Sequence, residues 1–109
     1  MNSYIDEKIK TLMAVVQKPF QNVLIRIKCP LDSGIKVECW RESDGVKSAQ
    51  IIPGGVRSFF KFVEQYRNEE PNQKFNVVNI SVEPSEKYTV SFIFDEDVQR
   101  EAEENIKQE

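Results

Sequence analysis

The fold is decided by residues 22–45, NVLIRIKCPLDSGIKVECWRESDG, in which apolar and polar residues alternate along two successive segments. A period of two is typical of a strand that buries one face. Residues 22–29 form the first predicted strand and residues 35–42 the second, joined by a turn that contains proline and glycine. The Asp44-Gly45 pair then predicts a tight hairpin turn into a weaker third strand over residues 46–52.

Helical periodicity flanks these strands. Residues 3–18 predict an amphipathic helix whose apolar stripe is Ile5, Ile9, Leu12, Met13 and Val16. Residues 55–68 predict a core helix whose stripe is Val56, Phe59, Phe60, Val63 and Tyr66, with Phe62 beside it. If Phe60 is fully buried there, Phe60→Ala should cost about 3–5 kcal/mol of stability.

The C-terminal third predicts two more strands and a helix. The strands are residues 74–83 and 87–94, and the apolar phase of the first changes midway, so we expect a bulge near Val77 or Val78. Residues 95–109 predict an acidic helix that can fray at its end, with a thin apolar stripe formed by Val98, Ala102 and Ile106.

These elements predict one α+β domain over residues 1–109, with the order α-β-β-β-α-β-β-α. A chain of 109 residues is a common size for a single domain. Short turns between neighbouring strands favour an antiparallel sheet of about five strands. The helices should pack mainly on one face, and the other face can meet water.

Charge and composition narrow the class of protein. Residues 95–109 hold seven acids and two bases, a charge of −5; the whole chain carries −3, so residues 1–94 carry +2. This is the reverse of the basic stripe of a nucleic-acid binder, so we predict no direct nucleic-acid partner. We also expect no membrane span and no secretory signal, and therefore a cytoplasmic protein.

Cys29 and Cys39 are interpreted as buried thiols, although a disulfide across the hairpin is the alternative.

The chain lacks the residues that most catalytic sites need. It contains no histidine, which removes histidine-based acid–base catalysis and histidine zinc sites, and two cysteines are too few for a zinc site. No glycine pattern matches a phosphate-binding loop. A catalytic pair among its eighteen acids is the remaining enzymatic alternative, but no spacing singles one out. We predict that the protein is not an enzyme and that it binds neither a cofactor nor a metal.

Trp40 is the strongest indication of a binding surface. It lies on the strand face opposite Cys39, and an outward tryptophan rimmed by charge is typical of an interface anchor. The alternative is that the N-terminal segment or the third helix covers it. Leu24, one strand away, is expected to join it. The predicted partner-binding residues are Trp40, Glu38, Glu42, Asp44, Asp95, Glu96 and Asp97.

Residues Lys74–Asp97, KFNVVNISVEPSEKYTVSFIFDED, resemble the C-terminal signature of the YezG-like immunity proteins. Tyr88 matches the early aromatic of the last strand, and Phe94-Asp95-Glu96-Asp97 its aromatic-acidic close; the turn Ser85-Glu86 departs from the family's usual glycine. The resemblance covers roughly residues 35–97. It implies that the chain binds and neutralises a cognate bacterial toxin domain and has no catalytic residues of its own. Many such toxins are nucleases, and the acids of this chain would occupy the basic groove of a nuclease.

The predicted order of elements also resembles the specialised secretion chaperones. That resemblance covers the whole chain but carries no motif, and it implies a homodimer that holds an effector segment in extended form. The sequence thus leaves monomer and homodimer open. An immunity protein should bind one folded toxin domain at near one-to-one ratio, whereas a chaperone should be a dimer in solution.

Overall fold

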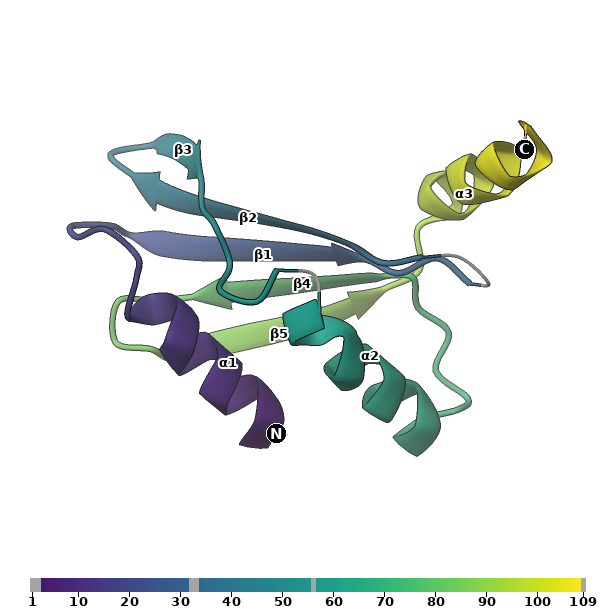
Figure 1. The fold of residues 1–109 in the computed structure, drawn as a ribbon, viewed down its shortest axis with the longest axis horizontal. Helices are drawn as coiled ribbons and strands as arrows, with labels where there is room; N and C mark the ends of the chain where they lie inside the picture. Colours follow the sequence, from purple (N-terminus) through teal and green to yellow (C-terminus); the bar gives the residue numbers. More distant parts are fainter. Residues whose placement is uncertain (1–2, 32–33, 56, 109) are drawn as a thin grey trace.

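A computed structural model describes residues 3–31, 34–55 and 57–108 of the chain and has the predicted order of elements (Figure 1). The elements are α1 (Ser3–Met13), β1 (Asn22–Lys28), β2 (Lys36–Ser43), β3 (Val46–Ala49), α2 (Arg57–Glu69), β4 (Val77–Val82), β5 (Tyr88–Ile93) and α3 (Glu96–Gln108). The predicted α+β class is confirmed.

The strands form one antiparallel sheet with β1 at its centre. Their spatial order is β3-β2-β1-β4-β5, so β4 pairs with the side of β1 that β2 leaves free. Along β1, Val23, Ile25 and Ile27 are buried, and the residues between them are half-buried. This alternation follows directly from the period of two in the sequence, because successive side chains of a strand point to opposite faces. β3 is shorter than predicted, and all its residues are exposed.

α1 and α2 lie on the same side of the sheet, and the hydrophobic core fills the space between them and the strands (Figure 1). The predicted stripe of α1 is confirmed, since Ile5, Ile9 and Leu12 are at most 1% exposed. The helix ends at Met13 rather than at residue 18. Just after this end, the Val15 N–H donates to the Leu12 carbonyl, which closes a turn tighter than that of an α-helix. Val16 stays buried in the segment that follows.

The apolar face of α2 differs from the prediction at one position. Phe59, Phe62 and Val63 are at most 2% exposed, whereas Phe60 is 48% exposed. The prediction of a buried Phe60 is therefore wrong. Phenylalanines at positions 59, 60 and 62 cannot all face the sheet on a helix with 3.6 residues per turn, and the sheet contacts the 59–62–63 face. Residue 56 lies outside the described residues.

β4 has no bulge. It pairs without interruption from Val77 to Val82 with both β1 and β5. The apolar residues change phase ahead of the strand, between the buried Phe75 and Val78. Val77 instead points to the face opposite α1 and α2, yet it is only 1% exposed. The predicted bulge is thus absent from β4 itself, and the irregularity lies one residue ahead of it, at Asn76. The Asn76 carbonyl accepts from the Cys29 N–H (2.8 Å) on the β1 side, while its N–H donates to the Ile93 carbonyl (3.0 Å) on the β5 side.

α3 follows β5 closely and is hydrogen-bonded to the segment after β1. Among the described residues, Val77 and Val98 are buried hydrophobic side chains outside the main core cluster. The side chain of Gln99 accepts from the Leu31 N–H (3.0 Å) and donates to the Leu31 carbonyl (3.3 Å). Beyond Ala102, which is half-buried, the Glu103 side chain is exposed, and the Ile106 side chain lies outside the described part. The helix is attached by its first turns and points away from α1 and α2 (Figure 1).

None of the described helices combines the length and the apolar character needed to cross a membrane.

Two turns place non-glycine residues in the left-handed region of backbone space. Asp44 (φ 52°) and Gly45 (φ 77°) form the predicted hairpin turn between β2 and β3, whose two positive φ angles are typical of a type I′ turn. In the β4–β5 turn, Glu86 has φ 71°. Side chains with a Cβ atom adopt such angles at a cost that glycine does not bear.

We expect Glu86→Gly to raise the free energy of unfolding by about 1 kcal/mol, because it removes the Cβ atom at a positive φ. Urea denaturation measures the change. Ser85→Gly is the matched control, since Ser85 is not among the positive-φ residues. That control should lower stability by up to about 1 kcal/mol, because glycine gains freedom in the unfolded chain. Equal losses in both variants would contradict a strained Glu86.

Candidate binding face

The face of the sheet that α1 and α2 leave uncovered, here called the open face, is organised in rows of cross-strand partners. The central row consists of Ala49, Trp40, Leu24, Ser81 and Thr89. The row beside it, toward α3, consists of Glu38, Arg26, Asn79 and Ser91. Polar residues therefore surround an apolar pair, Trp40 and Leu24, at the middle of the face.

Trp40 points outward, as predicted from the inward position of Cys39, which is 6% exposed. It is half-buried against its neighbours on the sheet. A hollow of about 330 Å³ opens at this point, and no residue of α1 or α3 lines it. The lining residues are Leu24, Ile25, Arg26, Trp40, Lys47, Asn79, Ile80, Ser81, Thr89 and Ser91. The alternative that the N-terminal segment or the third helix covers Trp40 therefore does not hold at this hollow.

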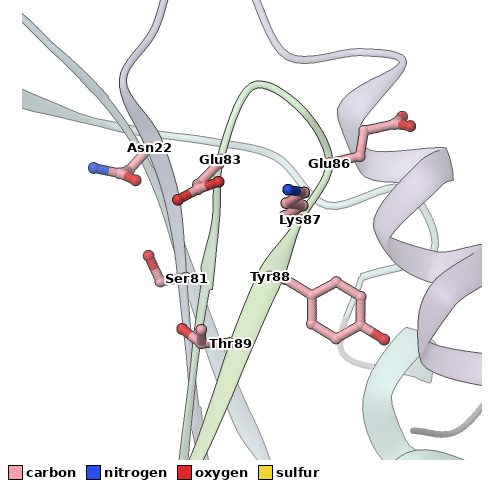
Figure 2. A pocket seen from close by; sticks show the side chains of 7 residues that line it. All are labelled: Asn22, Ser81, Glu83, Glu86, Lys87, Tyr88 and Thr89. Carbon is pink, nitrogen blue, oxygen red and sulfur yellow. The ribbon is translucent and has the colours of Figure 1, made fainter.

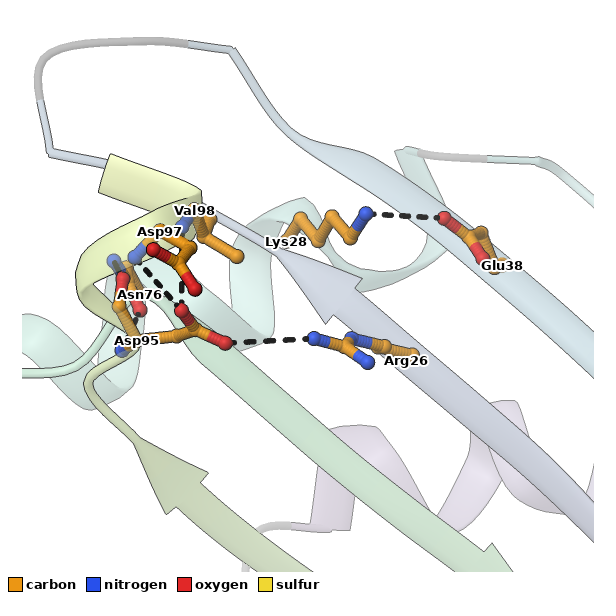
Figure 3. Close-up of polar contacts among 7 residues, drawn as sticks. All are labelled: Arg26, Lys28, Glu38, Asn76, Asp95, Asp97 and Val98. Carbon is orange, nitrogen blue, oxygen red and sulfur yellow. Dashed lines mark hydrogen bonds and ion pairs between the residues drawn. The ribbon is translucent and has the colours of Figure 1, made fainter. Parts of the chain in front are cut away.

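The acids predicted on β2 lie near bases, and Figure 3 shows the ion pair between Glu38 and Lys28. Glu38 Oε1 lies 3.6 Å from Lys28 Nζ and 3.7 Å from Lys36 Nζ. Glu42 is the cross-strand partner of Lys47. This part of the open face presents mixed charge rather than a negative patch.

Asp95 has a structural role at the start of α3 (Figure 3). Its Oδ1 accepts hydrogen bonds from the N–H groups of Asp97 (2.9 Å) and Val98 (3.3 Å), which makes it the helix N-cap. Its Oδ2 lies 3.8 Å from Arg26 Nη2. The fully buried Asn76 holds the Asp95 backbone from the other side, donating to its carbonyl and accepting from its N–H, both at 2.8 Å.

The predicted partner-binding residues thus fall into separate places. Glu38, Trp40 and Glu42 share the open face. Asp44 lies at the β2–β3 turn, where its N–H donates to Gln21 Oε1 (2.7 Å). Three further acids, residues 95–97, lie at the other end of the sheet, where Asp97 Oδ1 is 3.3 Å from Arg100 Nη2. The structure does not bring all seven into one site.

Sequence reasoning missed the polar residues that β1 and β4 contribute to the open face. These are Arg26, Asn79 and Ser81, together with Lys47 of β3 and Thr89 and Ser91 of β5. The alternation that placed Trp40 outward also assigns these residues to an outward face. Their proximity to Trp40 depends on the pairing of β4 with β1, which the sequence pattern does not specify.

A larger hollow, of about 540 Å³, lies at the β4–β5 turn (Figure 2). Ser81 and Thr89 belong to the open face, whereas Tyr88 points toward α1, so the polar groups that line this hollow do not converge. The Tyr88 hydroxyl donates to the Asp6 carboxylate of α1. Burial and the contact with Asp6 raise the pKa of Tyr88 to about 12, so the phenol keeps its proton at neutral pH.

Both cysteines are free thiols in the core, as predicted. The disulfide alternative is wrong, because Cys39 pairs with Ile25, four residues along the chain from Cys29. That offset corresponds to about 13 Å along a strand, well beyond the reach of a disulfide. Burial raises the pKa of the Cys39 thiol from its ordinary value of 9.0 to about 12, and it also raises the pKa of Cys29.

The Cys39 thiol should make stability fall at alkaline pH. The unfolded chain ionises this thiol above pH 9, whereas the folded chain keeps the proton until about pH 12, so unfolding is favoured as pH rises between these values. The slope of one such group is at most about 1.4 kcal/mol per pH unit. Urea denaturation between pH 8 and 11.5 should give a steeper decline for the natural chain than for Cys39→Ala. Parallel declines would contradict this account, since the other titrating groups are common to both proteins.

Within the ranges that the structure describes, no three cysteine, aspartate or glutamate side chains gather as a group that could hold a metal ion. A scan against protein-family models gives no match for this chain, and a search of curated protein sequences gives none either.

Proposed function

We propose that this chain is an immunity protein that binds a cognate bacterial toxin domain through its open face and neutralises it by covering its active site. The observation that carries the proposal is the uncovered face with Trp40 and Leu24 at its middle and polar or charged residues around them. In this proposal the protein acts in the cytoplasm and performs no catalysis of its own. The resemblance of residues 74–97 to the YezG-like immunity proteins supplies the toxin as the partner.

The chemistry of the open face suits a folded protein partner. Tryptophan is enriched among the residues that contribute most to protein interfaces, and such residues are usually surrounded by polar contacts that exclude water. Leu24 extends the apolar area beside Trp40, and Arg26 and Glu38 lie in the neighbouring row. A sheet face also offers a broad contact area supported by the core beneath it, which favours occlusion of an active site.

The exposed carboxylates of α3 have a separate part in this proposal. Glu101, Glu103 and Glu104 are exposed on a helix that points away from the body of the protein. Charges of one sign on such an extension accelerate the approach of an oppositely charged partner, more strongly at low ionic strength. The helix would thus attract a basic toxin domain, and the open face would hold it.

A secretion chaperone is the second candidate function, and the element order α-β-β-β-α-β-β-α favours it. It differs in oligomeric state and in the form of its partner. Light scattering coupled to size-exclusion chromatography separates the two candidates. A monomer that forms a one-to-one complex with a folded domain supports the immunity reading, whereas a dimer that binds an extended segment supports the chaperone reading.

The test of the immunity reading uses the product of the neighbouring gene as the partner. Trp40→Ala should weaken the complex by about thirtyfold, because truncating a central aromatic anchor typically costs 2 kcal/mol or more. Charge reversal at Glu38 and Glu42, added to this variant, should weaken it further. Calorimetric titration measures the affinity, and survival of cells that express the partner measures neutralisation.

Phe60→Ala provides the matched control, since Phe60 is an exposed aromatic on the opposite layer of the protein. It should leave the affinity unchanged. Thermal melting of each variant checks that the fold is intact. Unchanged affinity of the Trp40 variants, with unchanged melting curves, would exclude the open face as the binding surface.

A further inference from the structure

The hollow beside Trp40 has an uneven charge. Two of its lining residues are charged, Arg26 and Lys47, and both are cations. The other polar groups of the lining are the amide of Asn79 and the hydroxyls of Ser81, Thr89 and Ser91. Amides and hydroxyls can donate hydrogen bonds to an anion, so the hollow combines two positive charges with neutral donors.

The Arg26 side chain is 38% exposed, but one of its N–H donors lacks a partner. A guanidinium carries five N–H donors in a fixed planar arrangement. The ion pair that Arg26 makes with Asp95 is long, at 3.8 Å between Nη2 and Oδ2. Its Nε is shielded from solvent and has no hydrogen-bond partner among the described residues. A buried donor without a partner is unfavourable, so a ligand that engages Arg26 gains from correcting this state.

Asp95 does not supply the missing partner. Its other carboxylate oxygen accepts from the Asp97 and Val98 N–H groups, which fixes it at the start of α3. Glu38, the cross-strand partner of Arg26, lies instead beside Lys28 and Lys36. Of the two carboxylates near Arg26, Glu38 is engaged by the lysines, and Asp95 reaches Arg26 only through the long contact of its Oδ2.

We propose that this hollow receives a carboxylate side chain of the partner protein, bound by the Arg26 guanidinium, with an apolar partner side chain packed on Trp40 and Leu24. The inference rests on the proposed binding function and adds the chemistry that the partner must present. Arginine and carboxylate can form two parallel charge-assisted hydrogen bonds, which fix orientation as well as contribute affinity. Movement of Arg26 away from its long contact with Asp95 would let Nε take part.

The first test uses two matched probes, the peptides acetyl-Glu-Leu-amide and acetyl-Gln-Leu-amide. Each is titrated into the isotope-labelled protein while the Arg26 Nε–H and Trp40 indole N–H resonances are followed by NMR. The Glu peptide should shift both resonances in a saturable way and bind about tenfold more tightly than the Gln peptide, because only it offers a charged acceptor. Equal binding of the two peptides, or shifts confined to other residues, would overturn the proposal.

Variants locate the effect. Arg26→Gln should abolish the preference for the Glu peptide, and Arg26→Lys should retain only part of it, since lysine keeps the charge without the planar fork. Lys36→Gln is the matched control, because this exposed cation lies on the same strand face but outside the hollow. Inorganic phosphate is titrated separately. Phosphate that shifts the same resonances at lower concentration than the Glu peptide would overturn the assignment to a side-chain carboxylate.

The second test separates this inference from the proposed function. In the complex with the toxin domain, Arg26→Gln should weaken affinity by about tenfold. If Trp40→Ala weakens the complex and Arg26→Gln does not, the binding face stands and the carboxylate inference is wrong. If neither variant changes the affinity, the open face itself is excluded.

Discussion

Phe59→Ala is expected to lower the free energy of unfolding by about 3–5 kcal/mol, the usual cost of truncating a fully buried phenylalanine. Phe59 is 0% exposed and lies on the face of α2 that contacts the core. The loss combines the apolar contact area of the ring with the cavity left behind, because close-packed neighbours relax only partly. Urea denaturation, analysed with a common slope for all variants, measures the change.

Phe60→Ala is the control for this prediction, and it differs by one position along the same helix. Phe60 is 48% exposed, so its truncation should cost less than about 1 kcal/mol. Similar losses in the two variants would show that the orientation of α2 is wrong by part of a turn. A larger loss for Phe60→Ala would reverse the assignment of the two faces.

Asn76→Ala is the second large effect that we expect. The Asn76 side chain is fully buried and makes two 2.8 Å hydrogen bonds with the backbone of Asp95. Its removal leaves one part-buried N–H and one part-buried carbonyl without partners, at about 1–3 kcal/mol for each group. Because Asp95 begins α3, the helix should lose its attachment before the rest of the protein unfolds.

Two measurements distinguish this local effect from general destabilisation. Urea denaturation gives the global loss, and hydrogen exchange gives the protection of the α3 amides. Asn79→Ala is the matched control, because Asn79 is half-buried on the open face and belongs to the same strand region. It should leave exchange in α3 unchanged. Normal protection of α3 in Asn76→Ala would contradict the role assigned to these two hydrogen bonds.

The layered fold could be predicted because its strands and helices have distinct periods. Val23, Ile25 and Ile27 recur at every second position, and Ile5, Ile9 and Leu12 repeat at helical spacing, so each element indicated its own buried face. The orientation of α2 was harder to predict from the sequence. Phenylalanines at 59, 60 and 62 satisfy more than one helical stripe, and tertiary packing selected between them.

The phase of β4 shows a different limit of the pattern. Val77 and Val78 are both buried although they point to opposite faces of the sheet, and Phe75 shares the core with Val78 although the two are three residues apart. A rule that assigns one apolar face to each strand predicts a bulge there. The structure instead places the irregular hydrogen bonding at Asn76, just ahead of the strand, a position that the apolar pattern does not specify.

The candidate site was partly predictable for the same reasons. The outward direction of Trp40 followed from alternation with Cys39. The contribution of Asn79 and Ser81 depends on pairing between β1 and β4, which are far apart in the sequence. The engagement of Glu38 by two lysines and the capping role of Asp95 depend on side-chain geometry, which charge counts do not contain.

The two faces of the sheet also divide the sequence into two sets of positions with different tolerance to change. In β1, the side chains of Ile25 and Ile27 are buried in the core, whereas those of Leu24 and Arg26 are half-buried on the open face. Mutations confined to the outside set can exchange shape and charge with little effect on folding. Under the proposed function, substitutions at these alternate positions would change the partner that is recognised while keeping the same scaffold.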